Sequence, residues 1–247
     1  MAMVWALCAE LSHAQTTILN VDLNGARGST VGTTYTGNGV LRANGSAHDD
    51  PSLGTPTGYW NGIVFSTLNS PSPSTGLLDS SGQATGISLS FANWAFQDNA
   101  PEVPYGNGNA ANMALLNDYL GVASPSPGLL PTMTISGLAN NSAYTLYVYG
   151  SNGGAGAGGT WSVNGSATQV TTGNGSYPFG SFAQGREYTV FSVLSDSLGR
   201  LVLSGAPTDD PYVILNGFQL SPVPEPGSLS LICAAGAVLL AARRRRG

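Results

Sequence analysis

Hydrophobic and polar residues alternate along several segments in the middle of the chain. Residues 86–94 place Leu89 and Phe91 on one face and Ser88 and Ser90 on the other. A period of two residues is typical of a β-strand that buries one face. Similar runs predict strands over 17–23, 132–135, 143–149, 187–194, 200–204 and 212–220.

A short hairpin and one helix complete the predicted elements. Asn164-Gly165 separates two short β runs and favours the hairpin turn that matches strand twist. Residues 112–120 carry Leu116 and Leu120 at helical spacing, and Gly121 follows as a stop signal. We therefore expect an all-β protein, an antiparallel β-sandwich of two sheets, with one short helix.

The composition indicates a turn-rich exported protein and excludes one class of partner. Charged residues make up only 9% of the 247 residues, and 34 residues are glycine. Between the two ends of the chain, eleven acidic residues outnumber four basic ones, which are Arg27, Arg42, Arg186 and Arg200. A nucleic-acid-binding surface is basic, so nucleic acid is not an expected partner. Cys8 and Cys233 both lie outside residues 15–220, so we expect no disulfide in that region.

The C-terminal segment combines three features in a fixed order. Val223-Pro224-Glu225-Pro226 comes first, an apolar run covers 229–242, and Arg243-Arg244-Arg245-Arg246 follows. Arginine crosses a bilayer only at high cost, so the cluster should stop a membrane-spanning segment on the cytoplasmic side. This predicts a transmembrane helix over 228–242. An ordinary terminal helix is the alternative, because the run is shorter than the ~20 residues that span a hydrocarbon core.

This order of features resembles the PEP-CTERM sorting signal of Gram-negative bacteria. In that family the Pro-Glu-Pro motif is recognised by exosortase, a membrane-embedded processing enzyme. The resemblance implies that residues 221–247 form a sorting signal and that exosortase and the inner membrane are partners. It also implies a destination at the cell surface or in an extracellular matrix, in organisms that make exopolysaccharide.

The N-terminal 14 residues predict a signal peptide. Residues 1–11 are mostly apolar, and Ser12-His13-Ala14 offers small residues at the two positions that signal peptidase reads. The mature protein would begin near Gln15. A signal peptide normally starts with a basic residue, yet the first one is Arg27, and we interpret this as a start codon placed too late.

Residues 15–220 are expected to form one domain. They are too long for one fibronectin module, and no break divides them into two. Leu138 followed by Tyr144 at a strand start resembles the tyrosine corner of fibronectin-type sandwiches. Residues 215–220 instead resemble the last strand of the galactose-binding-like jelly rolls that precede PEP-CTERM tails. We therefore expect the jelly roll.

Calcium is the one candidate cofactor. Asp49-Asp50 and Asp209-Asp210 are each followed by proline in a polar loop. Oxygen ligands from loops at one end of a sandwich suit Ca²⁺, and galactose-binding-like domains often carry a structural calcium ion. The alternative is that both Asp-Asp-Pro sequences form solvated turns.

The chain carries no pattern typical of an enzyme, and no catalytic residue is predicted. Gly-x-Ser-x-Gly is absent, and His48, the one histidine of residues 15–220, lies in a polar loop. No two carboxylates are placed as a glycosidase needs them.

Carbohydrate is the candidate ligand of the domain. Tyr147 and Tyr149 lie opposite Leu146 and Val148 on the strand 143–149, so the alternation predicts both tyrosines at the surface. Exposed aromatic rings can stack on a sugar. We expect a non-enzymatic structural or adhesive protein with carbohydrate binding; the rival is a secreted hydrolase acting on polysaccharide or ester.

Overall fold

The computed structural model describes residues 18–27, 30–31, 58–67, 69–99, 115–116, 118–126, 128–151, 157–173, 182–208 and 211–223. Nearly all of these residues lie in β-strands or in the turns that connect them. Within the described segments, only Leu115 and Leu116 have a helical backbone. The predicted all-β class is therefore confirmed for this part of the chain, which forms several largely antiparallel sheets.

The largest sheet has six strands in the order β13-β10-β16-β1-β4-β5. Its strands are β1 (Leu19–Asn24), β4 (Asn61–Thr67), β5 (Ser70–Ser72), β10 (Ala143–Tyr149), β13 (Tyr188–Leu194) and β16 (Gly217–Pro222). Neighbours are antiparallel, except that β1 and β4 are parallel. The strands β1 and β16, which are the first and the last of this sheet in chain order, are thus neighbours at the centre of the sheet.

A second sheet has five antiparallel strands in the order β12-β11-β14-β9-β6. Its strands are β6 (Ser88–Ala92), β9 (Thr132–Ser136), β11 (Gly159–Val163), β12 (Gln169–Thr171) and β14 (Arg200–Ala206). Two smaller sheets join β7 (Phe96–Asn99), β8 (Asp118–Ala123) and β15 (Tyr212–Leu215), and β2 (Ala26–Arg27) with β3 (Thr30–Val31).

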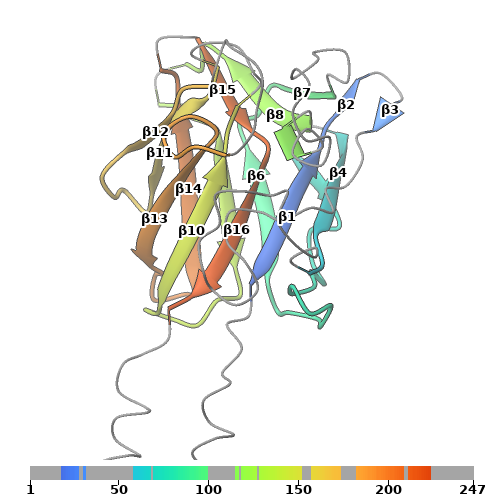
Figure 1. Cartoon of the computed structure of the whole chain (residues 1–247), viewed down its shortest axis with the longest axis vertical. Coiled ribbons are helices and arrows are strands. Elements are labelled where there is room, and N and C mark those ends of the chain that lie inside the picture. The colour runs from blue at the N-terminus through green and yellow to red at the C-terminus, as the bar shows by residue number, and fades with distance from the viewer. Residues whose placement is uncertain are drawn as a thin grey trace, which may run out of the picture.

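The two larger sheets face each other across a shared hydrophobic core (Figure 1). Alternate residues of each strand enter it, for example Leu146 and Val148 from β10 and Leu201 and Leu203 from β14. Trp161 of β11 is fully buried there, and its Nε1 donates a hydrogen bond to Thr171 Oγ1 at 2.9 Å. The alternation of hydrophobic and polar residues in the sequence therefore reflects the burial of one face of each of these strands in the shared core.

The strand and hairpin predictions over 132–170 are confirmed. Residues 132–135 and 143–149 fall within β9 and β10, and the two runs around Asn164-Gly165 form β11 and β12. Asn164 and Gly165 have positive φ angles of 49° and 72°. Two consecutive left-handed residues are what a two-residue hairpin turn requires, and Asn and Gly adopt this conformation most readily.

The predicted helix over 112–120 is wrong at its C-terminal end. Asp118–Ala123 is strand β8, in which Leu120 pairs with Leu215. The strand is buried on both faces except at its last residue, so its hydrophobic positions show no strand alternation. Gly121 is not a helix stop either: a Cβ at this position would lie 2.3 Å from the Phe96 ring.

The single strand predicted over 212–220 is also wrong, because two strands occupy these residues. β15 belongs to the three-stranded sheet, whereas β16 belongs to the six-stranded sheet, and Asn216 separates them. The buried Asn216 amide donates to the carbonyls of Leu116 and Asp118, and its Oδ1 accepts from Ser151 N at 2.7 Å. These side-chain bonds hold the chain where it passes from one sheet to the other.

Candidate functional site

The strands β1 and β16 bring both ends of the described chain to one end of the sandwich. They are antiparallel, and Leu19 at the start of β1 pairs with Leu220 near the end of β16. This end is at the bottom of Figure 1. We call it the exit end, and it includes the loops 137–142 and 195–199. These loops contact each other, since Leu138 N donates to Gly199 O at 3.0 Å.

Val223 marks the point where the predicted sorting motif leaves the domain. Its backbone N–H donates to Ala143 O at 2.9 Å, which extends the pairing of β16 with β10 by one residue. The other motif residues, Pro224, Glu225 and Pro226, lie outside the described residues, as do Arg243, Arg244, Arg245 and Arg246. The motif therefore follows the sheet directly, without a linker.

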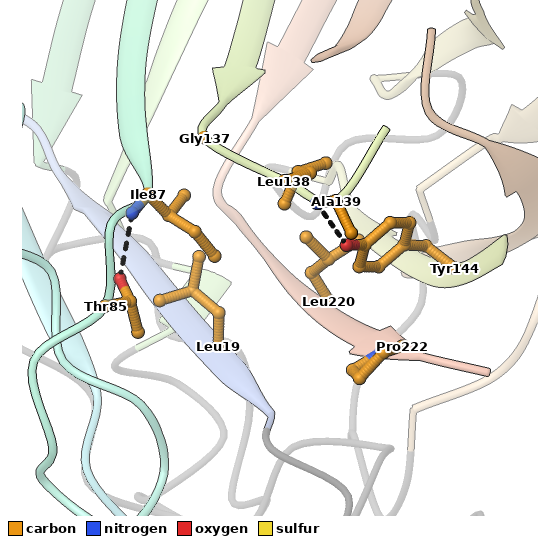
Figure 2. A pocket seen from close by; sticks show the side chains of 9 residues that line it. All are labelled: Leu19, Thr85, Ile87, Gly137, Leu138, Ala139, Tyr144, Leu220 and Pro222. Carbon is orange, nitrogen blue, oxygen red and sulfur yellow. Dashed lines mark hydrogen bonds between the residues drawn. The ribbon is translucent and has the colours of Figure 1, made fainter. Parts of the chain in front are cut away.

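A small pocket of about 200 Å³ lies at the exit end (Figure 2). It is lined by Leu19, Thr85, Ile87, Gly137, Leu138, Ala139, Tyr144, Leu220 and Pro222. Most of this lining is hydrocarbon from β1, β10 and β16 of the six-stranded sheet, from residues 85–87 just before β6, and from the loop 137–142. No carboxylate, imidazole or thiol is among these lining residues, so they offer no general acid or base for chemistry at neutral pH.

The two polar side chains of the pocket are bonded to backbone. The Tyr144 hydroxyl accepts a hydrogen bond from Ala139 N at 3.0 Å. Thr85 Oγ1 donates to Leu77 O at 2.8 Å and accepts from Ile87 N at 3.2 Å. The Tyr144 bond to the backbone five residues upstream is the contact that defines a tyrosine corner, so this local prediction is confirmed.

The surface position predicted for Tyr149 is wrong. Its exposed fraction is 0%, because the outer face of the six-stranded sheet is covered by a second hydrophobic cluster. The cluster consists of Trp60, Leu115, Leu116, Tyr149, Phe182 and Tyr188. Tyr149 cannot contact a glycan from this position. Alternation in β10 distinguished two faces of the strand but did not reveal that both are covered.

Tyr147 is half-buried on the same face. Its ring lies 6.1 Å from the ring of Tyr188 between centroids, and burial raises the pKa of its hydroxyl. Part of the ring remains accessible, so a glycan contact at Tyr147 stays a prediction.

A buried chain of hydrogen bonds crosses the covered face of the six-stranded sheet. The Tyr149 hydroxyl donates to Gln219 Oε1 at 2.6 Å, and Gln219 Nε2 donates to Asn20 Oδ1 at 2.8 Å. Asn20 Nδ2 in turn donates to Tyr59 O at 3.0 Å. We call Tyr149, Gln219 and Asn20 the amide ladder. The sequence did not predict it, because its members are far apart along the chain.

Glu187 is a buried carboxylate just before β13. Burial raises its pKa, and hydrogen bonds from Ala183 N at 2.8 Å and from the Arg186 guanidinium partly offset this. Both oxygens therefore hold the turn 183–187 and the adjacent arginine. A glycosidase needs a second carboxylate at a defined separation, whereas the described hydrogen bonds of the Glu187 carboxylate go to Ala183 and Arg186.

Several predicted residues cannot be placed. Asp49, Asp50, Asp209 and Asp210, the candidate calcium ligands, lie outside the described residues, as do His48 and the signal peptide of residues 1–14. The described residues contain no group of three or more side chains suited to a metal ion. No helix among them has the length and hydrophobicity of a membrane span, and the predicted transmembrane helix 228–242 lies outside them.

A family match covers the C-terminal tail. Residues 222–246 match the PEP-CTERM protein-sorting motif. The predicted sorting motif is thereby confirmed, and with it the general course that such motifs imply: export, sorting to the cell surface and processing by exosortase. The match begins at the last residue of β16. A comparison with curated proteins gave no match.

Three solved structures are distantly similar to the fold. Protein YXIM of Bacillus subtilis is 14% identical with a TM-score of 0.38, over 83% of this chain and 40% of that chain. The GH26-CBM35 β-(1,4)-mannanase of Podospora anserina is 15% identical with a TM-score of 0.31, over 57% and 29%. A complex of the plant peptide RALF23 with FER and LLG2 gives 14% identity and a TM-score of 0.36, over 87% and 44%. The chain spans less than half of each, and likeness at this level supports no argument about function.

Proposed function

We propose that this protein is a non-enzymatic structural or adhesive component of the cell surface or the extracellular matrix. One observation carries the proposal: the PEP-CTERM motif of residues 222–246 begins where the last strand of a folded β domain ends. The hydrogen bond of Val223 to Ala143 ties the chain to the sheet up to the residue just before Pro224-Glu225-Pro226. The tail thus directs the sorting of a folded domain, and this domain is the part of the chain that reaches the cell surface or the matrix.

The tail acts in two stages. The predicted transmembrane helix 228–242 and the four arginines after it first hold the chain in the inner membrane, with the domain on the periplasmic side. Exosortase then processes the chain near Pro224-Glu225-Pro226 and releases or transfers the domain. Before that step the signal peptide of residues 1–14 has been removed.

The domain over 15–220 is a single jelly roll of the galactose-binding-like class. Two facing sheets that share one core support this class, as does the central pairing of the first strand with the last. Calcium at Asp49, Asp50, Asp209 and Asp210 remains part of the proposal. A shift of the melting temperature with millimolar calcium is the expected sign, and its absence would exclude the ion.

Carbohydrate, and exopolysaccharide in particular, is the proposed ligand. The domain has few charges, and neutral sugars are bound by ring stacking and hydrogen bonds rather than by charge. Tyr147, half-buried on the outer face of β10, is the described residue that fits this role. Glycan-array binding that weakens in Tyr147→Ala but not in Tyr212→Ala, an exposed tyrosine of another sheet, supports it.

A secreted hydrolase acting on polysaccharide or ester is the rival function. The lining of the pocket at the exit end supplies no acid or base for hydrolysis, so this pocket gives the rival no support. A panel of chromogenic substrates discriminates the two. Turnover by the wild type that is lost in His48→Ala would establish the rival.

The sorting step is tested by expressing wild type and Glu225→Ala in a host that has exosortase. We expect the wild type to be cut near the motif and recovered outside the cell, and the variant to stay uncut in the membrane. Ser228→Ala, three residues further on, is the matched control and should be cut like the wild type. If wild type and Glu225→Ala both stay uncut, the tail is a plain membrane anchor.

A further inference from the structure

The exit end exposes two leucines beside the sorting tail. Leu198, in the turn between β13 and β14, has an exposed fraction of 66%, and Leu194, at the end of β13, has 61%. Leu194 lies near the tail, because it pairs with Ala143, whose carbonyl accepts the Val223 N–H, and Leu198 follows in the turn at the same end. Burying such exposed aliphatic side chains away from water would be favourable in free energy.

The turn that presents Leu198 is fixed by several hydrogen bonds. Asp196 Oδ1 accepts from Leu198 N at 2.8 Å and from Arg200 N at 2.9 Å. Asp196 O accepts from Gly199 N at 3.0 Å and from Asn141 N at 3.1 Å. The turn is therefore held against the loop 137–142, and Leu198 projects from a rigid support.

The charges at this end largely cancel. Arg200 Nε donates to Asp196 Oδ2 at 2.9 Å, so these two groups form an ion pair. Asp79 adds one negative charge. It lies beside the start of β1, because the N–H of the next residue, Ser80, donates to Ile18 O. A surface with these described charges is not attracted to an anionic membrane, so any contact with lipid has to be apolar.

The sorting tail keeps the exit end close to the bilayer. Only residues 224–228 separate Val223 from Leu229, the first residue of the apolar run. Even a fully extended chain of this length spans only about 20 Å. The two prolines of the motif favour an extended chain, but they cannot lengthen it. The exit end therefore lies within reach of the headgroup region, which is about 5–7 Å thick on each side.

We propose that the exit end docks on the membrane surface before processing, with Leu198 and Leu194 inserted among the lipid headgroups. The inference rests on the proposed membrane anchoring of the tail. Lipid is favoured over a protein partner because the two leucines project from a strand end and a turn and do not line a groove. Docking would hold the Pro-Glu-Pro motif at the membrane surface, within reach of the membrane-embedded processing enzyme.

A fluorescent label at position 198 of the full chain tests this proposal. The background carries Cys8→Ser and Cys233→Ser, the probe is an environment-sensitive dye on Leu198→Cys, and the vesicles consist of phosphatidylethanolamine and phosphatidylglycerol. Leu129→Cys is the matched control: its exposed fraction is 59%, and it lies before β9, at the opposite end of the sandwich. We expect quenching by brominated lipid to be at least about twofold greater at position 198 than at position 129, and independent of salt.

The outcomes separate docking from anchoring. Vesicle flotation reports anchoring, and a chain that does not float contradicts the proposed function of the tail. A chain that floats while the label at 198 is quenched no more than the label at 129 overturns docking alone. Shielding of position 198 only when exosortase is added, or only at high protein density, would also overturn it, in favour of a protein partner or a second copy.

Discussion

Tyr149 and Gln219 are joined by a hydrogen bond of 2.6 Å between the Tyr149 hydroxyl and Gln219 Oε1, and both side chains have an exposed fraction of 0%. The bond connects β10 to β16, and Gln219 continues it to Asn20 of β1. The amide ladder thus ties together three strands at the centre of the six-stranded sheet. Its value to the fold is testable by removing single polar atoms.

Tyr149→Phe should lower the free energy of unfolding by about 1–2 kcal/mol, because it deletes a buried hydrogen bond while keeping the ring. Urea unfolding followed by Trp fluorescence measures the change. Tyr147→Phe, on the same strand but half-buried, is the control and should alter stability by less than about 0.5 kcal/mol. Equal losses in the two variants would contradict a special role of the ladder.

Tyr144→Phe should cost about 1 kcal/mol by removing the acceptor of the Ala139 N–H. Ala139 is exposed, so water can replace the hydroxyl in part, and the loss should be smaller than for Tyr149→Phe. Thermal melts of the two variants provide the ranking. The reverse order would mean that the tyrosine corner, and not the amide ladder, is the stronger tie.

Gly199→Ala should destabilise the domain more than Gly165→Ala. Both glycines have positive φ angles, 67° and 72°, so alanine is strained by about 1–2 kcal/mol at either position. A Cβ at Gly199 would also lie 2.1 Å from Leu138 O, whereas a Cβ at Gly165 meets nothing within 4 Å. We expect an additional cost of about 1–3 kcal/mol at Gly199. Denaturant midpoints that fall together would disprove the predicted clash between the two loops.

The carboxyl of Glu187 should make the stability of the domain depend on pH. Burial raises its folded-state pKa above the unfolded value of 4.5, so the folded protein holds this proton more tightly. Its contribution to stability is fully present below pH 4.5 and is lost as the pH rises through the folded pKa. Glu187→Gln cannot lose the proton, so its stability relative to wild type should increase from pH 4 to pH 7.

Unfolding of both proteins at each pH measures this difference. The difference in stability between the two proteins removes the contribution of Asp79, which has the opposite pH dependence. Although burial opposes the shift, hydrogen bonds from Ser81, Gln83 and Gly82 lower the pKa of Asp79 in both proteins. A difference that stays constant between pH 4 and pH 7 would show that Glu187 is not perturbed.

Local sequence patterns predicted the strands that bury one face. They also predicted the sorting tail, because its motif is recognised from the order of its residues. β9 and β14 alternate cleanly, since one face of each meets the shared core. The motif from Val223 to Pro226 depends on residue order alone, so no fold was needed to recognise it.

What the sequence could not predict depends on contacts between distant segments. Asn20 and Asp22 alternate with apolar residues in β1 and therefore indicate an exposed face, yet both are fully buried. The cover includes Trp60 and Leu115, and nothing in the sequence of β1 reports their position. For the same reason Tyr149 was wrongly predicted at the surface, and β4 was not predicted at all.

The position of β16 sets the order in which the domain can fold. This strand, the last of the fold, lies between β10 and β1, and the bond from Gln219 to Asn20 closes a sequence separation of 199 residues. Until β16 arrives, the six-stranded sheet consists of two separate parts, β13-β10 and β1-β4-β5. A chain that is exported from its N-terminus therefore stays incomplete until its final strand emerges. The sorting match begins at the last residue of β16, so under the proposed anchoring the sheet would close at about the time the anchor segment reaches the membrane.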